Sequence, residues 1–150
     1  TRLYFTINSL FPVILSQICD KVEAKMIHVT TDCVFSGKDG KYNEKSLHDE
    51  INDYGMSKSL GEFCKATILR TSIIGEEVNN KRSLVEWVFS NKNSTINGYK
   101  NHMWNGVTCL QLAKIIQTII QLCSYNFKII IYTTYIVTIY IIKLFNVITM

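Results

Sequence analysis

The sequence contains no glycine-rich turn of the form GxGxxG or GxxGxxG, and its first glycine is Gly37. Such a turn, placed between a strand and a helix, is what holds a dinucleotide pyrophosphate in a βαβ unit. The chain therefore has no pyrophosphate motif of this kind. It also has a single proline, Pro12, so few breaks in secondary structure come from that residue type.

Acidic residues are absent after Glu86. Residues 1–86 carry 11 basic and 12 acidic side chains, whereas residues 87–150 carry five basic side chains and no acidic one. The basic part could attract an anionic ligand such as a nucleotide diphosphate, or it could reflect a biased composition without a function. No basic stripe interleaved with aromatic residues and no zinc-ligand spacing occurs, so nucleic acid is not an expected partner.

The five cysteines form no CxxC pair and do not cluster with the three histidines. An odd, dispersed set of cysteines indicates reduced thiols rather than a disulfide framework. We therefore expect a cytoplasmic location and no metal site. No initiator methionine or signal peptide is present, and we interpret residues 1–8 as a remnant rather than as a true start of the chain.

Residues 26–65 read as a strand, a polar loop and a helix. Ile27 and Val29 alternate with polar residues, and the run ends in two hydroxyls and a carboxylate, at Thr30, Thr31 and Asp32. Ligands of open α/β sheets lie beyond the carboxyl ends of the strands. We therefore expect Thr30 and Thr31 to face a ligand.

The helix of this segment is expected to begin after Asn52 or Asp53, either of which can cap it. Tyr54 and Lys58 then lie one turn apart on the same face. A phenol with a pKa of about 10 is a poor acid at neutral pH unless a nearby cation stabilises its phenolate, and Lys58 is such a cation. With a threonine hydroxyl from the strand, this arrangement can polarise a ketone.

The chain resembles the extended short-chain dehydrogenase/reductases, and among them the dTDP-4-dehydrorhamnose reductases. The segment TTDCVFSG (residues 30–37) is similar to the family's Ser-Thr-Asp-x-Val-Phe-x-Gly motif. The helix sequence YGMSK (residues 54–58) with Glu62 is similar to its Tyr-x-x-x-Lys helix. Gly40, Tyr42 and Glu44 match its Gly-x-Tyr-x-Glu loop, and ILRT (residues 68–71) matches its next strand. The resemblance covers residues 8–122.

This resemblance implies a Rossmann-like α/β fold, with a parallel sheet flanked by helices, and the reduction of a 4-keto group on a nucleotide-linked 6-deoxyhexose by NADPH or NADH. Tyr54 would donate the proton, and Thr31 would hold the carbonyl oxygen. Lys58 would lower the pKa of Tyr54 and hold the cofactor ribose, with Thr30 also near the cofactor. The substrate contacts implied are Asp32, Val34, Phe35, His102 and Trp104.

Departures from the family pattern leave specificity and activity open. The proline usual before the catalytic tyrosine is missing, which predicts a looser loop over residues 36–53, serving as a lid or as a connector. The family's opening glycine turn would lie upstream of Thr1, so we expect a fold truncated at the amino end and weak binding of NAD(P)H. Two alternatives to an enzyme are a binding subunit, like the regulatory subunit of methionine adenosyltransferase, and an inactive gene product. A homodimer or a synthetase partner is conceivable, and a membrane partner is not expected.

The chain is divided into a partial reductase domain, residues 1–124, and an apolar tail, residues 125–150. The longest uncharged run of the tail, residues 129–142, has 14 residues, fewer than the ~20 that span a bilayer. The tail could be a membrane helix or an aggregation-prone strand, but we favour translation past a disrupted reading frame.

Four further elements follow from patterning. A helix capped by Ser9 is expected to bury Leu15, Ile18, Cys19 and Val22, and a single buried strand is expected over residues 66–74. Ser83 is expected to open a short helix in which Trp87 is packed core. Thr108 and Gln111 are expected to cap a helix that buries Leu110, Ala113, Ile116 and Ile120.

Overall fold

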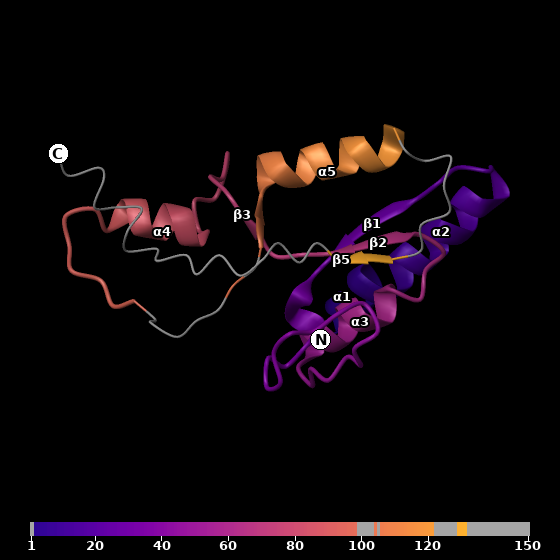
Figure 1. The fold of residues 1–150 in the computed structure, drawn as a ribbon, viewed down its shortest axis with the longest axis horizontal. Coiled ribbons are helices and arrows are strands. Elements are labelled where there is room, and N and C mark those ends of the chain that lie inside the picture. Colours follow the sequence, from indigo (N-terminus) through magenta and orange to yellow (C-terminus); the bar gives the residue numbers. More distant parts are fainter. Residues whose placement is uncertain (1, 99–103, 105, 122–128, 132–150) are drawn as a thin grey trace. The chain divides into compact units, whose positions relative to one another are not determined.

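The computed structural model describes residues 2–98, 104, 106–121 and 129–131. The chain divides into two compact units, Thr1–Ser72 with Cys123–Tyr132 (unit 1) and Ile73–Leu122 with Thr133–Met150 (unit 2). Figure 1 labels most of their helices and strands. None of the helices in the described part of the chain is long and apolar enough to cross a membrane.

Unit 1 begins with a helix whose winding changes along its length. It passes from α1 (Arg2–Tyr4) through the π-helical η1 (Phe5–Leu10) into α2 (Phe11–Lys21), and the junction residues all keep helical backbone angles. Pro12 has no N–H to donate to the carbonyl of Asn8, four residues earlier. The N–H of Phe11 donates to Thr6 O, five residues earlier, which is the π-helical pattern. The expectation that Ser9 caps this helix is therefore wrong.

The sheet of unit 1 is parallel. Strand β1 (Ile27–Thr30) pairs with β2 (Thr67–Arg70), and β2 pairs on its other side with β5 (Ile129–Ile131). The register places Thr30 beside Arg70, so both strands end at the same edge. The short 3₁₀ helix η2 (Asp32–Val34) follows β1 directly, and α3 (Asp53–Gly61) follows the loop. This parallel sheet with its helices confirms the Rossmann-like α/β class.

Helix α3 packs closely on η1 because its glycines leave room for backbone. A Cβ atom on Gly61 would lie 2.0 Å from Asn8 O, and one on Gly55 would lie 2.4 Å from Cys33 O. Ser57 between them is completely buried; its hydroxyl accepts a hydrogen bond from Asn8 Nδ2 (3.0 Å) and donates one to Tyr54 O (2.8 Å). The start of α3 is thereby held against both η1 and η2.

Unit 2 contains a two-stranded parallel sheet of β3 (Ile73–Ile74) and β4 (Val107–Thr108), with helices α4 (Leu84–Ser90) and α5 (Cys109–Gln121). The caps predicted from sequence are confirmed, because Ser83 accepts from the Glu86 N–H and Thr108 Oγ1 from the Gln111 N–H. The single strand expected over residues 66–74 is wrong, since it breaks at Thr71 and Ser72 into β2 and β3, which belong to different sheets.

Two predicted apolar faces and one predicted core residue are also wrong. In α5 the buried residues are Ile115 and Ile119, whereas Leu110 and Ile120 are more than 60% exposed. In α2 the buried residues are Pro12 and Ser16, with Ile18 and Val22 exposed, and Trp87 is 45% exposed on α4. The apolar residues of α2 and α5 cover a wider part of each helix than the side that packs, so spacing alone does not identify the packed side.

Strand β5 lies within the segment assigned to the tail, and the rest of that segment falls outside the described residues. Deleting residues 125–150 should lower the melting temperature, because it removes one of the two neighbours of β2. Deleting only residues 133–150 leaves β5 in place and is the matched control. We expect a loss of several degrees, about 1 to 2 kcal/mol, for the larger deletion alone. Equal melting temperatures of the two truncated chains would show that β5 does not stabilise the sheet.

Candidate active site

The candidate site lies at the carboxyl end of β1, where η2 and the first turn of α3 meet. Asn52 caps α3 by accepting a hydrogen bond from the Gly55 N–H (2.8 Å), which fixes Tyr54 in the first turn. Tyr54 is 39% exposed, and Lys58 Nζ lies 5.9 Å from the centroid of its ring. The predicted neighbourhood of phenol and ammonium is confirmed.

Thr31 caps η2, and its hydroxyl accepts a hydrogen bond from the Cys33 N–H (3.1 Å). The Thr31 side chain also hydrogen-bonds to the Tyr54 phenol, which lowers the pKa of that phenol. The strand end therefore brings together the hydroxyl and the phenol of the predicted site.

The pKa of Tyr54 is nevertheless raised above its ordinary value of 10.0. Partial burial is the main cause, with Cys33, Asp32 and Tyr4 adding to it, and together they outweigh the hydrogen bond from Thr31. The expectation that Lys58 lowers this pKa is not met in this structure, in which the ammonium lies over the ring face. Tyr54 accordingly holds its proton at neutral pH, as a general acid must before it acts.

Lys58 has a second neighbour that the sequence analysis did not consider, His28 on β1. Burial lowers the pKa of His28 and the nearby Lys58 charge lowers it further, so the imidazole is neutral at neutral pH. Its Nε2 atom is buried and has no hydrogen-bond partner within the described residues. The alternation of side chains along β1 predicts that His28 lies on the other face of the strand from Ile27 and Val29, but no sequence motif indicated a role for it.

Several predicted ligand contacts are packed inside unit 1 instead. Thr30 is 5% exposed and Val34 is completely buried, and their contacts with a ligand stay predictions. The Phe35 ring stacks on Tyr42, with centroids 4.4 Å apart, and its other contacts are the edge of His48 and the guanidinium of Arg70. These contacts join Phe35 to the loop and to β2, and its contact with a substrate stays a prediction.

The remaining assignments are less tightly tied to Tyr54. Asp32 is partly exposed in η2 and accepts a long hydrogen bond from Thr31 Oγ1 (3.4 Å), so it remains near the site. Trp104 belongs to unit 2 and is partly buried there, while His102 lies outside the described residues. Their substrate contacts stay predictions. Among the described residues, no three His, Cys, Asp or Glu side chains form a group that could hold a metal ion.

A buried ion pair lies beneath the loop. The Arg70 Nε–H donates to both Glu62 oxygens (2.7 and 3.0 Å), and Arg70 Nη2 lies 2.7 Å from Glu62 Oε2, with both side chains about 5% exposed. His48 Nε2 lies 3.7 Å from the same carboxylate, and His48 Nδ1 lies 2.6 Å from Ser59 Oγ. These contacts tie the loop, α3 and β2 together.

The loop over residues 36–52 is anchored rather than loose. Ser36 donates to Asp49 from its backbone N–H (2.8 Å) and from its hydroxyl, and Glu50 N bonds to Val34 O (3.2 Å). The two hydrogen bonds from Ser36 lower the pKa of Asp49. These polar contacts anchor the loop within unit 1, and the expectation that it is looser than the family's loop stays a prediction.

His48 predicts a pH dependence of stability. Burial and the charge of Arg70 lower the pKa of His48, so the unfolded chain binds the proton more readily than the folded chain. The neutral imidazole therefore contributes to the free energy of unfolding above pH ~6.5, and this contribution is lost as the pH falls. The substitution His48→Gln can keep the contact with Ser59. It should reduce the decline in the free energy of unfolding between pH ~7.5 and pH ~5.5 by about 0.5 kcal/mol or less. Denaturant titrations at both pH values measure it. The raised pKa of Glu62, due mainly to burial, acts in the opposite direction in both proteins, so only their difference reports on His48. If the decline in the free energy of unfolding were unchanged in His48→Gln, the assignment of this pH dependence to His48 would be wrong.

Comparisons with known proteins place the chain in a family. Residues 1–120 match the family model of the RmlD substrate binding domain. A probable low-salt glycan biosynthesis reductase of Haloferax volcanii is 36% identical over 94 residues, which are 56% of this chain and 31% of that protein.

Solved structures show the same fold. A hypothetical dTDP-4-dehydrorhamnose reductase from Sulfolobus tokodaii is similar with a TM-score of 0.75 at 24% identity, over 89% of this chain and 48% of that chain. The dTDP-4-dehydrorhamnose reductase of Bacillus anthracis, solved in complex with NADP, gives a TM-score of 0.73 at 24% identity, over 87% and 48%. The chain therefore spans about half the length of these two solved reductases, and it belongs to the RmlD substrate binding domain family.

Proposed function

We propose that this protein takes part in the NAD(P)H-dependent reduction of the 4-keto group of a nucleotide-linked 6-deoxyhexose. The observation that carries the proposal is the placement of Tyr54 at the carboxyl end of β1, hydrogen-bonded to Thr31 and covered by the Lys58 ammonium. A proton donor, a second hydroxyl and a cation around one point are what reduction of a carbonyl requires.

The residues present fit the nicotinamide ribose end of a dinucleotide. Lys58 and Tyr54 supply a cation and a hydroxyl at one sheet edge, and the buried His28 Nε2 beside Lys58 still has capacity for one hydrogen bond. When bound, the nicotinamide supplies the hydride. Lys58 and Tyr54 would hold the ribose hydroxyls. The 150 residues carry no glycine turn for the pyrophosphate, so the rest of the dinucleotide needs groups from elsewhere.

On the substrate side, the Tyr54 hydroxyl would give its proton to the carbonyl oxygen as negative charge develops there. Thr31 would donate a hydrogen bond to the same oxygen. Lys58 would stabilise the phenolate that remains on Tyr54, by moving from the face of the ring toward its oxygen. This division of roles makes Tyr54 the proton source and Thr31 a positioning contact.

The test is an assay of dTDP-4-keto-6-deoxyhexose reduction by a chimera in which the amino-terminal half of the Bacillus anthracis reductase precedes this chain. Oxidation of NADPH that depends on the sugar nucleotide would support the proposal. A folded chimera that binds NADPH but reduces no nucleotide-linked ketone would contradict it, and would favour the binding-subunit alternative.

A further inference from the structure

The first helix of unit 1 meets α3 through one row of side chains that are spaced by four residues. The row consists of Tyr4, Asn8, Pro12 and Ser16, and its members lie against Tyr54, Ser57, Gly61 and Lys65, in that order. Each step of four residues along the row is matched by three or four residues on the other side. The two segments therefore run in the same direction and in register, and Figure 1 shows α1 beside α3.

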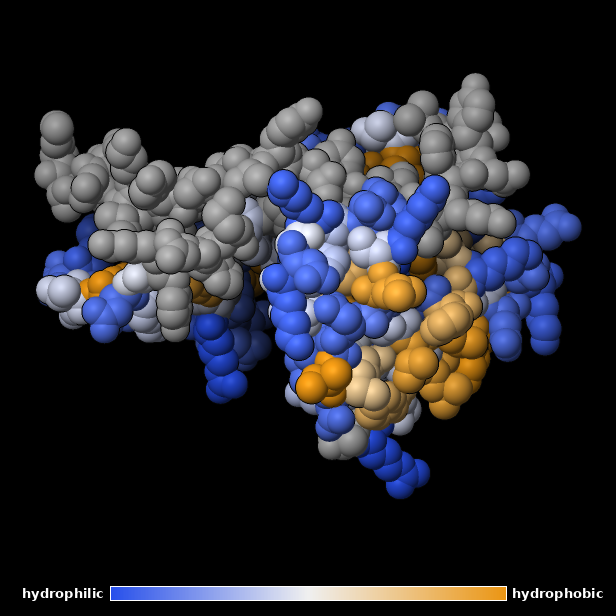
Figure 2. Space-filling view, turned by 60° about the horizontal axis from the view of Figure 1, so that its bottom comes forward, coloured by the Kyte–Doolittle hydropathy of each residue, from blue (hydrophilic) through white to orange (hydrophobic). Residues whose placement is uncertain are grey.

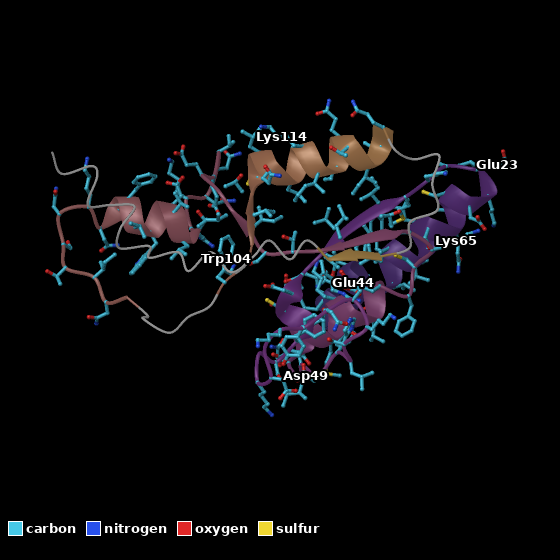
Figure 3. All side chains as sticks on the ribbon, in the orientation of Figure 1. Glu23, Glu44, Asp49, Lys65, Trp104 and Lys114 are labelled. Atoms are coloured by element: carbon cyan, nitrogen blue, oxygen red, sulfur yellow. The ribbon has the colours of Figure 1, made fainter. Side chains whose placement is uncertain are left out.

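Two polar contacts fix this register behind Tyr4. Asn8 Nδ2 donates a hydrogen bond to Ser57 Oγ (3.0 Å), and the Lys65 N–H donates one to Ser16 Oγ (3.2 Å). Figure 3 labels Lys65, near the helix α2 that carries Ser16. Sliding the first helix along α3 by one turn would break both hydrogen bonds and leave their partly buried groups unpaired. Tyr4 is therefore held at one place beside α3.

Tyr4 stands at the front of this row, against the ring of Tyr54. The ring centroids are 6.1 Å apart and the ring planes cross at 72°, an edge-to-face arrangement that aromatic pairs prefer. Lys58 Nζ lies 5.9 Å from the centroid of the Tyr54 ring. The Tyr54 ring is thus bounded by an aromatic ring and by an ammonium.

The contact between the two tyrosines is not part of the packed core of unit 1. Tyr4 is 47% exposed and Tyr54 is 39% exposed. Leu3 and Ile7, which lie outside the row on the same helix, are exposed as well, and Figure 2 shows hydrophobic residues gathered on the face that comes forward in that view. Core packing therefore does not require an aromatic ring at residue 4.

We propose that Tyr4 is a positioning residue for the candidate site, whose ring directs the phenol of Tyr54 so that its hydroxyl stays beside Thr31. The helix register holds Tyr4, and the edge-to-face contact restricts rotation of the Tyr54 ring. The effect on turnover rests on the proposed function, whereas the effect on the surroundings of Tyr54 does not.

The ionisation of Tyr54 reports on this contact. Burial is the main cause of the raised pKa of Tyr54, and the charge of Cys33 comes second. Asp32 and Tyr4 act in the same direction. Removing the Tyr4 ring would uncover the phenol and take away one of these charges, while Lys58 would stay over the ring face. Both changes favour the phenolate, so they lower the pKa of Tyr54.

The experiment is an NMR titration of the full chain with tyrosine labelled at Cζ, in which the Tyr54 resonance is the one that Tyr54→Phe removes. Tyr4→Ala should lower the pKa of Tyr54 toward 10.0, because the covering ring and its charge are both lost. Tyr4→Phe keeps the ring, so the pKa of Tyr54 should lie between its values in the parent and in Tyr4→Ala.

Leu3→Ala is the matched control, since Leu3 precedes Tyr4 in α1 and is 67% exposed. It should leave the pKa of Tyr54 as in the parent, and circular dichroism of each variant shows whether the helices are kept. An unchanged pKa of Tyr54 in Tyr4→Ala would overturn the proposal, as would an equal shift in Leu3→Ala.

Steady-state kinetics of the chimera measure the effect of Tyr4 on the reaction. Tyr4→Ala should lower turnover by about 10- to 100-fold, the loss that a small misplacement of a reacting group causes, with the KM for NADPH unchanged. Tyr4→Phe should stay within about twofold of the parent, because the ring is what directs the phenol. Equal losses in Tyr4→Ala and Tyr4→Phe would overturn this role of the ring, as would parent-like turnover in Tyr4→Ala. A chimera without any turnover would contradict the proposed function, whereas the titration would still decide whether Tyr4 positions Tyr54.

Discussion

Replacement of Tyr54 by phenylalanine is expected to lower the turnover of carbonyl reduction by about 10²- to 10⁴-fold, the range that general acid catalysis contributes. The substitution keeps the ring, its T-shaped contact with Tyr4 and the position of Lys58, and removes only the hydroxyl. Cofactor affinity should change little. The measurement is steady-state kinetics of the chimera with NADPH and the keto sugar nucleotide.

Thr31→Val is the matched comparison. It is nearly isosteric, and it removes a hydrogen bond to the carbonyl oxygen and to the phenol but leaves the proton source in place. The loss of turnover should therefore be smaller than for Tyr54→Phe, roughly 10-fold. A rate for Tyr54→Phe within about twofold of the parent would mean that another group delivers the proton, and the catalytic assignment of α3 would be wrong.

Lys58→Met separates the two roles of the ammonium. The cation is expected to stabilise the phenolate and to hold the ribose, so its loss should reduce both turnover and NADPH affinity, whereas Tyr54→Phe should reduce mainly turnover. Since the pKa of Tyr54 is raised in this structure by burial, the lysine has to offset that burial during the reaction. A Lys58→Met variant with unchanged turnover would show that it does not.

The core of the candidate site was predictable because its signals are local. Asn52 precedes Tyr54 by two residues and Lys58 follows it by one turn, so the cap, the phenol and the ammonium belong to one helix. The carboxyl end of β1 was equally local, since the alternation of Ile27 and Val29 stops at the hydroxyl residues. Short-range periodicity and capping chemistry decide such features before any tertiary contact forms.

The supporting contacts were not predictable, because they join residues far apart in sequence. Asn8 bonds to Ser57, 49 residues away, and Ser36 bonds to Asp49 across the loop. One signal was available, because Gly55 and Gly61 in a helix of nine residues cost about 1 kcal/mol each relative to alanine. Such a cost indicates that another backbone passes close by, which is what η1 and η2 do.

The substrate contacts that the family motif implies stay predictions, and two of them fall on residues that also pack within unit 1. Val34 and Phe35 lie in the matching segment, yet Val34 is completely buried and Phe35 packs on Tyr42. A motif records which residue types recur, and it does not separate those that touch a ligand from those that hold the strand end. Only the burial of each side chain makes that distinction.

Replacement of Arg70 by methionine should cost about 3 to 5 kcal/mol of the free energy of unfolding, the loss expected when one partner of a buried ion pair is removed. The Glu62 carboxylate is 6% exposed and takes its charged hydrogen bonds from Arg70. Without Arg70 it would be buried beside the ring of His48, or would hold a proton. Urea denaturation at neutral pH measures the loss.

The matched control is Lys65→Met, which removes an ion pair with Asp20 whose side chains are 75% and 56% exposed. Solvent screens such a pair, so the loss should be about 1 kcal/mol or less. Combining Arg70→Met with Glu62→Leu should recover part of the stability, because no buried charge is then left unpaired. The recovery distinguishes a charge effect from lost packing, since the guanidinium also lies 5.6 Å from the centre of the Phe35 ring. A double variant no more stable than Arg70→Met alone would show that the loss comes from the packing of Arg70, including its Phe35 contact, rather than from an unpaired Glu62 charge.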